Sequence, residues 1–181
     1  MIDMEKPRFA TLAGMIFLAA ASRLIPHPPN FTPLAAMALF GGAYISDKRL
    51  AFGLPLAALL LSDAVLGFYH DMIWVYGSFA LIVCLGLLLQ SRRRLLPIAG
   101  AALASSVLFF VITNFGFIIS DDLYPRTLEG LATGYVAAIP FYQNTIAGDL
   151  VYTALLFGGF AIIENKFPAL RASTAADAAA G

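Results

Sequence analysis

Charged side chains are scarce in this chain. Its 181 residues include 11 Lys and Arg and 11 Asp and Glu, so charged residues make up 12% of the sequence. Soluble domains carry about 25% charged residues, and this composition excludes an ordinary soluble domain. The few basic residues are spread over several short turns and form no patch of the kind that binds a polyanion. We therefore expect no nucleic-acid partner.

Motifs for catalysis and for a resident cofactor are also missing. Cys84 is the single cysteine, so neither an intrachain disulfide nor a paired-cysteine metal site is possible. The sequence contains no GxxxxGK[ST] phosphate loop, no HExxH zinc motif and no nucleophile elbow. The chain is therefore predicted to be no enzyme and to hydrolyse no nucleotide, and Cys84 is interpreted as a buried structural residue.

Long hydrophobic runs take up most of the chain, and hydrophobic residues make up 60% of it. A helix needs about 20 apolar residues to cross a hydrocarbon layer of roughly 30 Å. The runs predict helices near 9–25, 33–46, 50–68, 72–90, 95–119 and 144–163. We expect an all-α polytopic membrane protein: one six-transmembrane-helix domain over residues 1–171, followed by a disordered tail at 172–181.

Two segments fit this pattern less simply. The run 33–46 is short for a crossing, so the helix either begins earlier, at Asn30, or is partly re-entrant. Residues 127–140 are apolar but end at Pro140, and we interpret them as a separate helix that lies over the outer mouth or dips into it. The first run follows basic residues as a signal peptide does, but we expect it to remain as a helix.

Basic residues alternate along this path. Nine of the eleven fall in breaks that six crossings place on one side, and only Arg23 and Arg126 fall on the other. Positive charge favours the cytoplasmic side of a membrane. We therefore expect both termini to be cytoplasmic, in a multi-pass protein of the bacterial cytoplasmic (inner) membrane.

Polar and aromatic side chains gather at the opposite, outer end. They are His27, Asn30, Thr32, Tyr69, His70, Asp71, Trp74, Tyr76, Tyr124, Tyr142, Gln143 and Asn144. An interfacial belt would explain the Trp and Tyr residues without any ligand. The loop around His27 has four prolines in eight residues, so it is stiff and forms either one wall of a pocket or a plain connector.

Two carboxylates, Asp63 and Asp149, fall at hydrocarbon depth, where an ionised group is costly and faces a cavity or a partner. On a continuous helix Asp63, Gly67 and His70 would share one face toward the outer mouth. Arg23 could form an ion pair with either carboxylate. A structural salt bridge and a functional role both remain open for each of them.

Five segments carry a resemblance to a known family: Asn30-Phe31-Thr32-Pro33, Ala38-Leu39-Phe40-Gly41-Gly42-Ala43-Tyr44, Val75-Tyr76-Gly77-Ser78-Phe79-Ala80, Thr113-Asn114-Phe115-Gly116 and Ala138-Ile139-Pro140-Phe141-Tyr142-Gln143-Asn144-Thr145. They resemble a family of small six-helix bacterial membrane proteins related to the substrate-binding S-components of energy-coupling-factor (ECF) transporters, and most closely the BtuM-type cobalamin proteins. The resemblance implies a six-helix bundle with a ligand at the outer mouth, walled by the first, third and fifth loops. It also implies a partner, a transmembrane coupling subunit with ATPases, which the small-residue faces near Gly14 and Ala38 to Gly42 could contact.

We therefore expect a substrate-binding component of a vitamin-uptake system, whose ligand is a neutral or zwitterionic micronutrient and first of all cobalamin or a related corrinoid. The expected substrate-binding residues are His27, Asn30, Phe31, Thr32, Asp63, Tyr69, His70, Asp71, Trp74, Tyr76, Asn114, Tyr142, Gln143 and Asn144. His70 or His27, and with less support Cys84, could ligate the cobalt of a corrinoid. The alternatives are a proton- or cation-coupled carrier that uses Asp63 and Asp149, and a structural membrane protein without a ligand.

Overall fold

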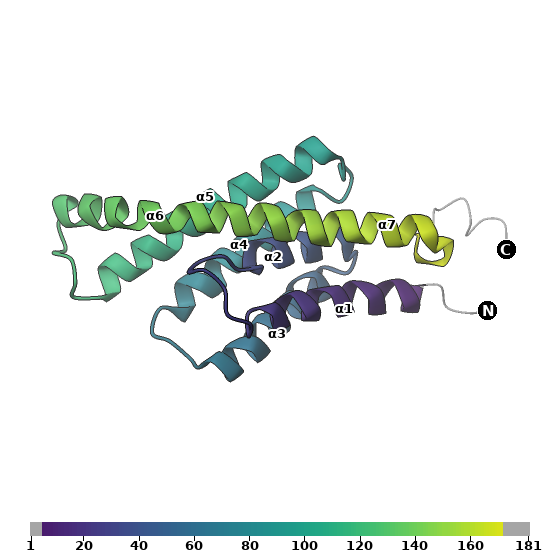
Figure 1. Cartoon of the computed structure of the whole chain (residues 1–181), viewed down its shortest axis with the longest axis horizontal. Helices are drawn as coiled ribbons and strands as arrows, with labels where there is room; N and C mark the ends of the chain where they lie inside the picture. Colours follow the sequence, from purple (N-terminus) through teal and green to yellow (C-terminus); the bar gives the residue numbers. More distant parts are fainter. Residues whose placement is uncertain (1–4, 172–181) are drawn as a thin grey trace.

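The computed structural model describes residues 5–171, and within them the chain is all-helical, without a strand (Figure 1). The helices are α1 (Glu5–Ser22), α2 (Leu34–Tyr44), α3 (Lys48–Leu66), α4 (Met72–Leu88), α5 (Leu95–Ser120), α6 (Leu128–Thr153) and α7 (Gly159–Lys166). The expected tail at 172–181 lies outside the described residues. The all-α prediction is confirmed.

Local sequence explains where several helices begin and end. The carboxylate of Asp47 accepts hydrogen bonds from the backbone N–H groups of Arg49 and Leu50, at 2.8 and 3.1 Å, and so caps the start of α3. The hydroxyl of Thr127 caps α6 in the same way, 3.1 Å from the N–H of Gly130. Helix α3 ends at Leu66 and is followed by Gly67, whose φ of 101° is a conformation that other residues rarely adopt.

One long rod forms the last part of the bundle. Helix α6, a π-helical turn at Ala154–Gly158 and α7 run without a break from Leu128 to Lys166, over 39 residues (Figure 1). The prediction of a separate helix over 127–140 is therefore wrong. Pro140 lies inside α6. A proline in a helix removes one backbone hydrogen bond, and α6 continues past this position to Thr153.

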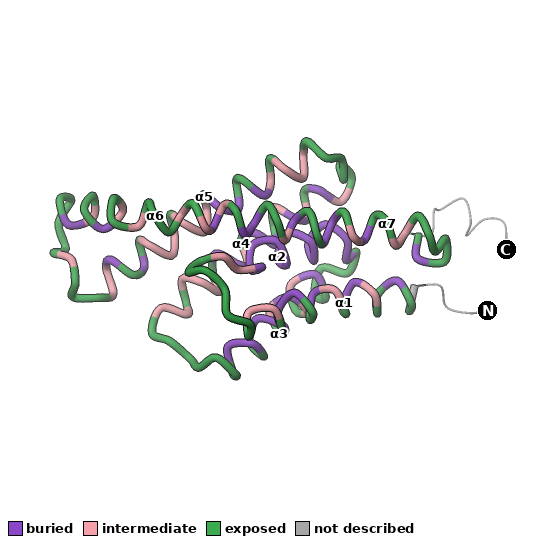
Figure 2. The backbone as a smooth tube through the Cα atoms, in the orientation of Figure 1, coloured by how far each residue is buried: buried purple, intermediate pink, exposed green. Residues whose placement is uncertain are grey.

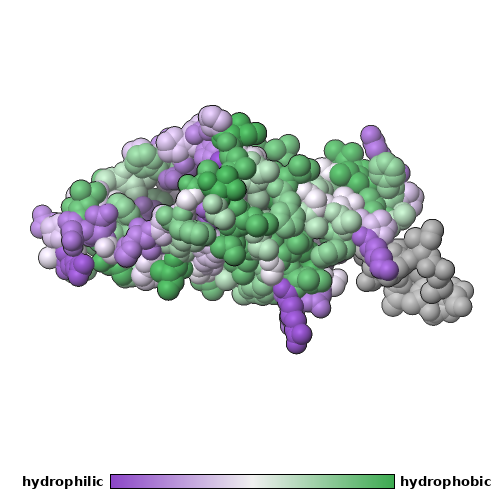
Figure 3. Space-filling model, turned by 90° about the horizontal axis from the view of Figure 1, so that it is seen from below, coloured by the Kyte–Doolittle hydropathy of each residue, from purple (hydrophilic) through white to green (hydrophobic). Residues whose placement is uncertain are grey.

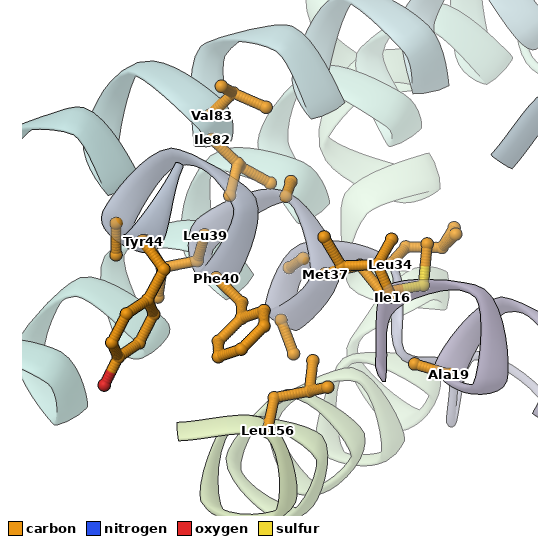
Figure 4. Close-up of a cluster of buried hydrophobic side chains, with 14 of the residues drawn as sticks. Ile16, Ala19, Leu34, Met37, Leu39, Phe40, Tyr44, Ile82, Val83 and Leu156 are labelled. Carbon is orange, nitrogen blue, oxygen red and sulfur yellow. The ribbon is translucent and has the colours of Figure 1, made fainter. Parts of the chain in front are cut away.

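The short helix α2 lies at the centre of the bundle. All eleven of its residues are buried, and the tube in Figure 2 shows this element enclosed by the others. Phe40 packs on Phe157 and Phe160, and Tyr44 packs on the same two rings, with centroids 4.8 to 5.9 Å apart. Figure 4 shows Phe40 on α2 with its ring toward Leu156. The segment predicted to be short or re-entrant is thus a buried half-length helix.

Glycines set the spacing between α2 and α4. A Cβ atom on Gly42 would collide with the carbonyl oxygen of Val83 and lie 2.9 Å from both the Cα of Gly86 and the backbone nitrogen of Leu87. The two backbones therefore touch directly, as small residues allow in helix bundles. The prediction that the segment Ala38 to Gly42 contacts a coupling subunit is wrong for this structure, because the segment is buried inside the bundle.

The basic turns meet at one end of the molecule, which we call the basic end. Arg8 of α1 forms an ion pair with Glu164 of α7 and donates to the carbonyl oxygen of Leu170. Arg93 lies over the ring of Tyr44 at 4.9 Å, and the amide of Gln90 donates to the carbonyl oxygens of Gly42 and Ile45, at 3.0 Å each. The start of α1 and the end of α7 lie at this end (Figure 1).

Hydrophobic side chains dominate the middle of the surface. In Figure 3 hydrophobic residues cover the centre of the long axis, and hydrophilic residues gather at the end that holds the turn between α5 and α6. Three helices are long and apolar enough to cross a membrane: α3, α5 and the rod Leu128–Lys166. Helices α2 and α4 are apolar but shorter.

Gly42→Ala should lower the stability of the fold by about 1 to 3 kcal/mol, because the added methyl group meets backbone atoms that have no room to move. Gly14→Ala is the matched control, since a Cβ at Gly14 meets nothing within 4 Å. Thermal unfolding in detergent measures both variants. Equal midpoints for Gly42→Ala and Gly14→Ala would contradict the close approach of α2 and α4.

Candidate functional site

A cavity of about 300 Å³ lies at the end of α2 opposite to the basic end. We call it the α2 cavity. Five parts of the chain line it: the loop before α2, the first turn of α2, the loop before α4 with the first turn of α4, one face of α5, and the last turns of α6. The lining residues are Asn30, Thr32, Leu34, Ala35, Tyr69, Asp71, Val75, Phe109, Phe110, Thr113, Asn114, Phe117, Thr145 and Asp149.

The first turn of α2 forms part of the cavity wall, through Leu34 and Ala35. The first backbone hydrogen bond into this helix is made by the N–H of Met37, which donates to Pro33 at 2.8 Å. Within residues 5–171 the N–H groups of Leu34, Ala35 and Ala36 have no acceptor, and no side chain caps the helix. These groups give the wall a partial positive charge.

Asp149 brings a carboxylate to the cavity from the last turns of α6. The residue is 3% exposed. The hydroxyl of Ser106 donates to its Oδ2 at 2.6 Å, whereas its Oδ1 has no hydrogen-bond donor among the described residues. An ionised carboxylate with one free oxygen is costly to hold in such a place.

Asp71 supplies a second carboxylate, from the loop before α4. Its Oδ1 is buried and has no hydrogen-bond partner in the described part of the chain. Its carbonyl oxygen accepts from the backbone N–H of Trp74 at 3.1 Å, but its side chain does not cap α4. Both carboxylates of the cavity therefore keep unused acceptor capacity.

Aromatic rings and hydroxyl groups complete the walls. Phe109, Phe110 and Phe117 come from one face of α5, together with the hydroxyl of Thr113 and the amide of Asn114. Tyr69 faces them from the loop before α4. Partial burial of its phenol, together with the negative charge of Asp63, raises the pKa of Tyr69 to about 12. The phenol therefore keeps its proton at physiological pH and can donate a hydrogen bond.

The loop between α1 and α2 is held against α6. The amide of Asn144 donates to the carbonyl oxygen of Pro29 at 3.0 Å, and the ring of Phe31 lies 5.9 Å from that of Tyr152. Gly148 allows this approach, because a Cβ there would lie 3.0 Å from the backbone nitrogen of Thr32. The proline-rich loop thus forms a wall of the cavity, through Asn30 and Thr32.

Asp63 belongs to a different cluster, which ties α1, α3 and α4 together. Its Oδ1 lies 2.7 Å from Nη2 of Arg23, and its Oδ2 accepts from the hydroxyl of Tyr76 at 2.9 Å. Arg23 also donates to Ser62. The predicted ion pair of Arg23 with Asp63 is confirmed, and Asp63 is fully buried. The predicted face with His70 is wrong, because α3 ends at Leu66 and His70 lies in the following loop.

Of the fourteen predicted substrate-binding residues, the cavity brings together five: Asn30, Thr32, Tyr69, Asp71 and Asn114. Phe31, Asp63, Tyr76 and Asn144 instead make the structural contacts described above. Trp74 packs on Phe115 and over Gly116, and Tyr142 stacks on Phe110 with centroids 4.5 Å apart. Gln143 is exposed on α6 and outside the cavity lining.

The residues proposed as cobalt ligands lie elsewhere. His27 and His70 are exposed and do not line the cavity. The prediction of a buried Cys84 is wrong, since Cys84 is exposed on α4. Its neighbours Ile82, Val83 and Gly86 occupy the buried face of that helix. No group of three His, Cys, Asp or Glu side chains able to hold a metal ion occurs in residues 5–171.

Sequence reasoning missed most of the α5 wall and the contributions of α2 and Val75. A signal for the wall was present, because Phe110, Asn114 and Phe117 follow the i, i+4, i+7 spacing of one helix face, and Asn114 had already marked that face. Asp149 was expected either in a structural salt bridge or as a functional carboxylate, and it was not among the predicted substrate-binding residues, although it lines the cavity.

These features define an all-helical protein with three helices able to cross a membrane and a polar, aromatic-walled cavity at one end. The chain belongs to the Family of unknown function (DUF6580), whose model matches residues 4–170. No curated protein and no solved structure matches the chain.

Asp63→Asn should destabilise the protein by about 3 to 5 kcal/mol, because it leaves the buried guanidinium of Arg23 without its counter-charge. Asp122→Asn is the control, since Asp122 is exposed and pairs loosely with Arg126 at 3.6 Å. Thermal or denaturant unfolding compares the two. A control and an Asp63→Asn variant of equal stability would show that the ion pair does not hold α1 to α3.

Proposed function

We propose that this chain is an integral membrane protein of the bacterial inner membrane that captures a small polar micronutrient in the α2 cavity for uptake into the cell. The hydrophobic middle of the surface and the three long apolar helices support the membrane location. The collected basic turns support a cytoplasmic position for the basic end, with both termini on that side. The α2 cavity then opens toward the outside.

The α2 cavity is the observation that carries this proposal. Its volume of about 300 Å³ lies at the lower end of the range for ligand sites, roughly 300 to 1,000 Å³. Its walls combine apolar rings with a few polar groups, as binding sites for small molecules do. A ligand-free structural protein has no need for two carboxylates with unused acceptors beside an open helix terminus.

The volume of the cavity limits the size of the ligand. A volume of about 300 Å³ suits a small molecule, because it lies at the low end of the range for ligand pockets. A corrinoid macrocycle with its side chains is several times larger, and neither His27 nor His70 lines the cavity. The structure therefore favours a smaller micronutrient than the corrinoid that the sequence resemblance suggests, within the same role of substrate capture.

An energising partner, such as an ECF-type coupling subunit with ATPases, remains part of the proposal. The exposed face of α1 is the candidate contact, since Gly14, Phe17 and Leu18 are exposed there and a Cβ on Gly14 would meet nothing within 4 Å. This face could accept a partner helix at close range.

A proton- or cation-coupled carrier is the second candidate, favoured by the buried carboxylate of Asp149 in the cavity wall. Asp63 is less suited to that role because Arg23 and Tyr76 already occupy its oxygens. Uptake by the protein reconstituted alone in liposomes, driven by a pH gradient and lost in Asp149→Asn, would favour the carrier over capture with a partner.

Val75→Phe should abolish ligand binding, because the larger ring fills part of the α2 cavity. The experiment screens a panel of water-soluble vitamins, cyanocobalamin included, for compounds that raise the unfolding midpoint of the purified protein. A compound at one hundred times its Kd stabilises the folded state by about 2.7 kcal/mol. We expect at least one small member of the panel to do so, and Val75→Phe to remove the effect.

Val111→Phe is the matched control. Val111 is 46% exposed on α5 and does not line the cavity, so the same change in size should leave the midpoint shift intact. A panel without any stabilising compound would contradict substrate capture. A shift that persists in Val75→Phe would place the ligand outside the α2 cavity.

A further inference from the structure

We infer that the ligand of the α2 cavity is a small organic cation, held between the carboxylates of Asp71 and Asp149. The inference rests on the proposed function and names its substrate class, where the sequence alone suggested a neutral or zwitterionic compound. It is carried by the charges on the cavity wall, by the acceptors that the protein leaves unused there, and by the aromatic rings around them.

The lining has acidic side chains and no basic ones. Asp71 and Asp149 line the α2 cavity, whereas none of its lining residues is Lys, Arg or His. A bound cation favours the ionised form of both carboxylates, and together they outweigh the positive charge of about half a unit at the open N-terminus of α2. Of the two basic residues expected on this side, Arg23 forms an ion pair with Asp63, and Arg126 is exposed near Asp122. A cation is therefore the ligand of complementary charge.

The carboxylates also have free acceptors. Oδ1 of Asp71 is buried without a partner, and Asp149 receives only the hydroxyl of Ser106 among the described residues, on Oδ2. A buried acceptor that leaves water without gaining a donor costs about 1 to 3 kcal/mol, and more when charged. A cationic ligand would remove that cost by supplying positive charge and, if it carries N–H groups, hydrogen bonds.

The remaining walls suit an organic cation better than a bare metal ion. The rings of Phe109, Phe110, Phe117 and Tyr69 line the cavity, and aromatic faces attract ammonium and guanidinium groups, more strongly when water is excluded. Residues 5–171 contain no group of three or more His, Cys, Asp or Glu side chains that could hold a metal ion. The side-chain amides of Asn30 and Asn114 add neutral polar contacts at the rim and on α5.

The test compares ligands of one shape and different charge. Choline, its neutral carbon isostere dimethylbutanol and the anionic isostere dimethylbutanoate are titrated against the purified full-length protein, with tetramethylammonium and guanidinium as further cations. Binding is read from the unfolding midpoint and by calorimetry. We expect the cations to bind and choline to bind at least about tenfold more tightly than dimethylbutanol.

Variants of Asp149 and Asp71 then test whether these two carboxylates hold the cation. Asp149→Asn and Asp71→Asn keep the size of each side chain, and each should weaken choline binding about tenfold or more and dimethylbutanol binding much less. Asp122→Asn, an exposed carboxylate outside the cavity, should leave choline binding as it is. The midpoint of each unliganded variant shows whether the variant is folded.

The outcomes separate this inference from the proposed function. Equal binding of choline and its neutral isostere, or unchanged choline binding in Asp149→Asn and Asp71→Asn, would overturn the cation inference. So would a protein that ignores all three cations but responds to a neutral or anionic vitamin, and that result would leave substrate capture standing. A protein that responds to neither series would overturn both.

Discussion

Helix α2 is too short to reach from one end of the bundle to the other, and it is buried on every side. Its eleven residues span roughly 16 Å, about half the thickness of a hydrocarbon layer. Glycine contacts with α4 and aromatic contacts with the α6–α7 rod fix its position close to the basic end. The other helices continue past its first turn, so the space beyond that turn becomes the α2 cavity, with unpaired N–H groups in its wall.

The buried and half-buried acidic residues at the two ends of the bundle have different partners. At the basic end Arg8 pairs with Glu164, which joins the first and last helices. At the other end Arg23 pairs with Asp63, so this carboxylate is neutralised within the bundle. Asp149 has no such cation among the described residues and keeps its place in the cavity wall. Two buried carboxylates that look alike in the sequence therefore have different consequences, one for folding and one for the charge offered to a ligand.

Much of the fold could be predicted from the sequence, because hydrophobic runs and basic turns report directly on helices and on the ends of a bundle. The same signals could not place Pro140, since a proline both ends helices and lies within them. They could not decide the orientation of Cys84, because both faces of α4 are apolar. Asn30, Thr32, Tyr69, Asp71 and Asn114 were found because they are polar and near helix ends. The phenylalanines of α5 were missed because they are apolar residues in an apolar helix, and only their spacing from Asn114 relates them to the cavity.

The central claim is that the space beyond the first turn of α2 is open to water on the side opposite to the basic end. Accessibility of single cysteines tests it most directly, in a Cys84→Ala background and in intact spheroplasts treated with a small membrane-impermeant thiosulfonate. Ala35→Cys, in the cavity wall, should react from outside, whereas Ala43→Cys, buried near the other end of the same helix, should not. An Ala35→Cys variant that stays unmodified, or that reacts only from the cytoplasmic side, would contradict the account.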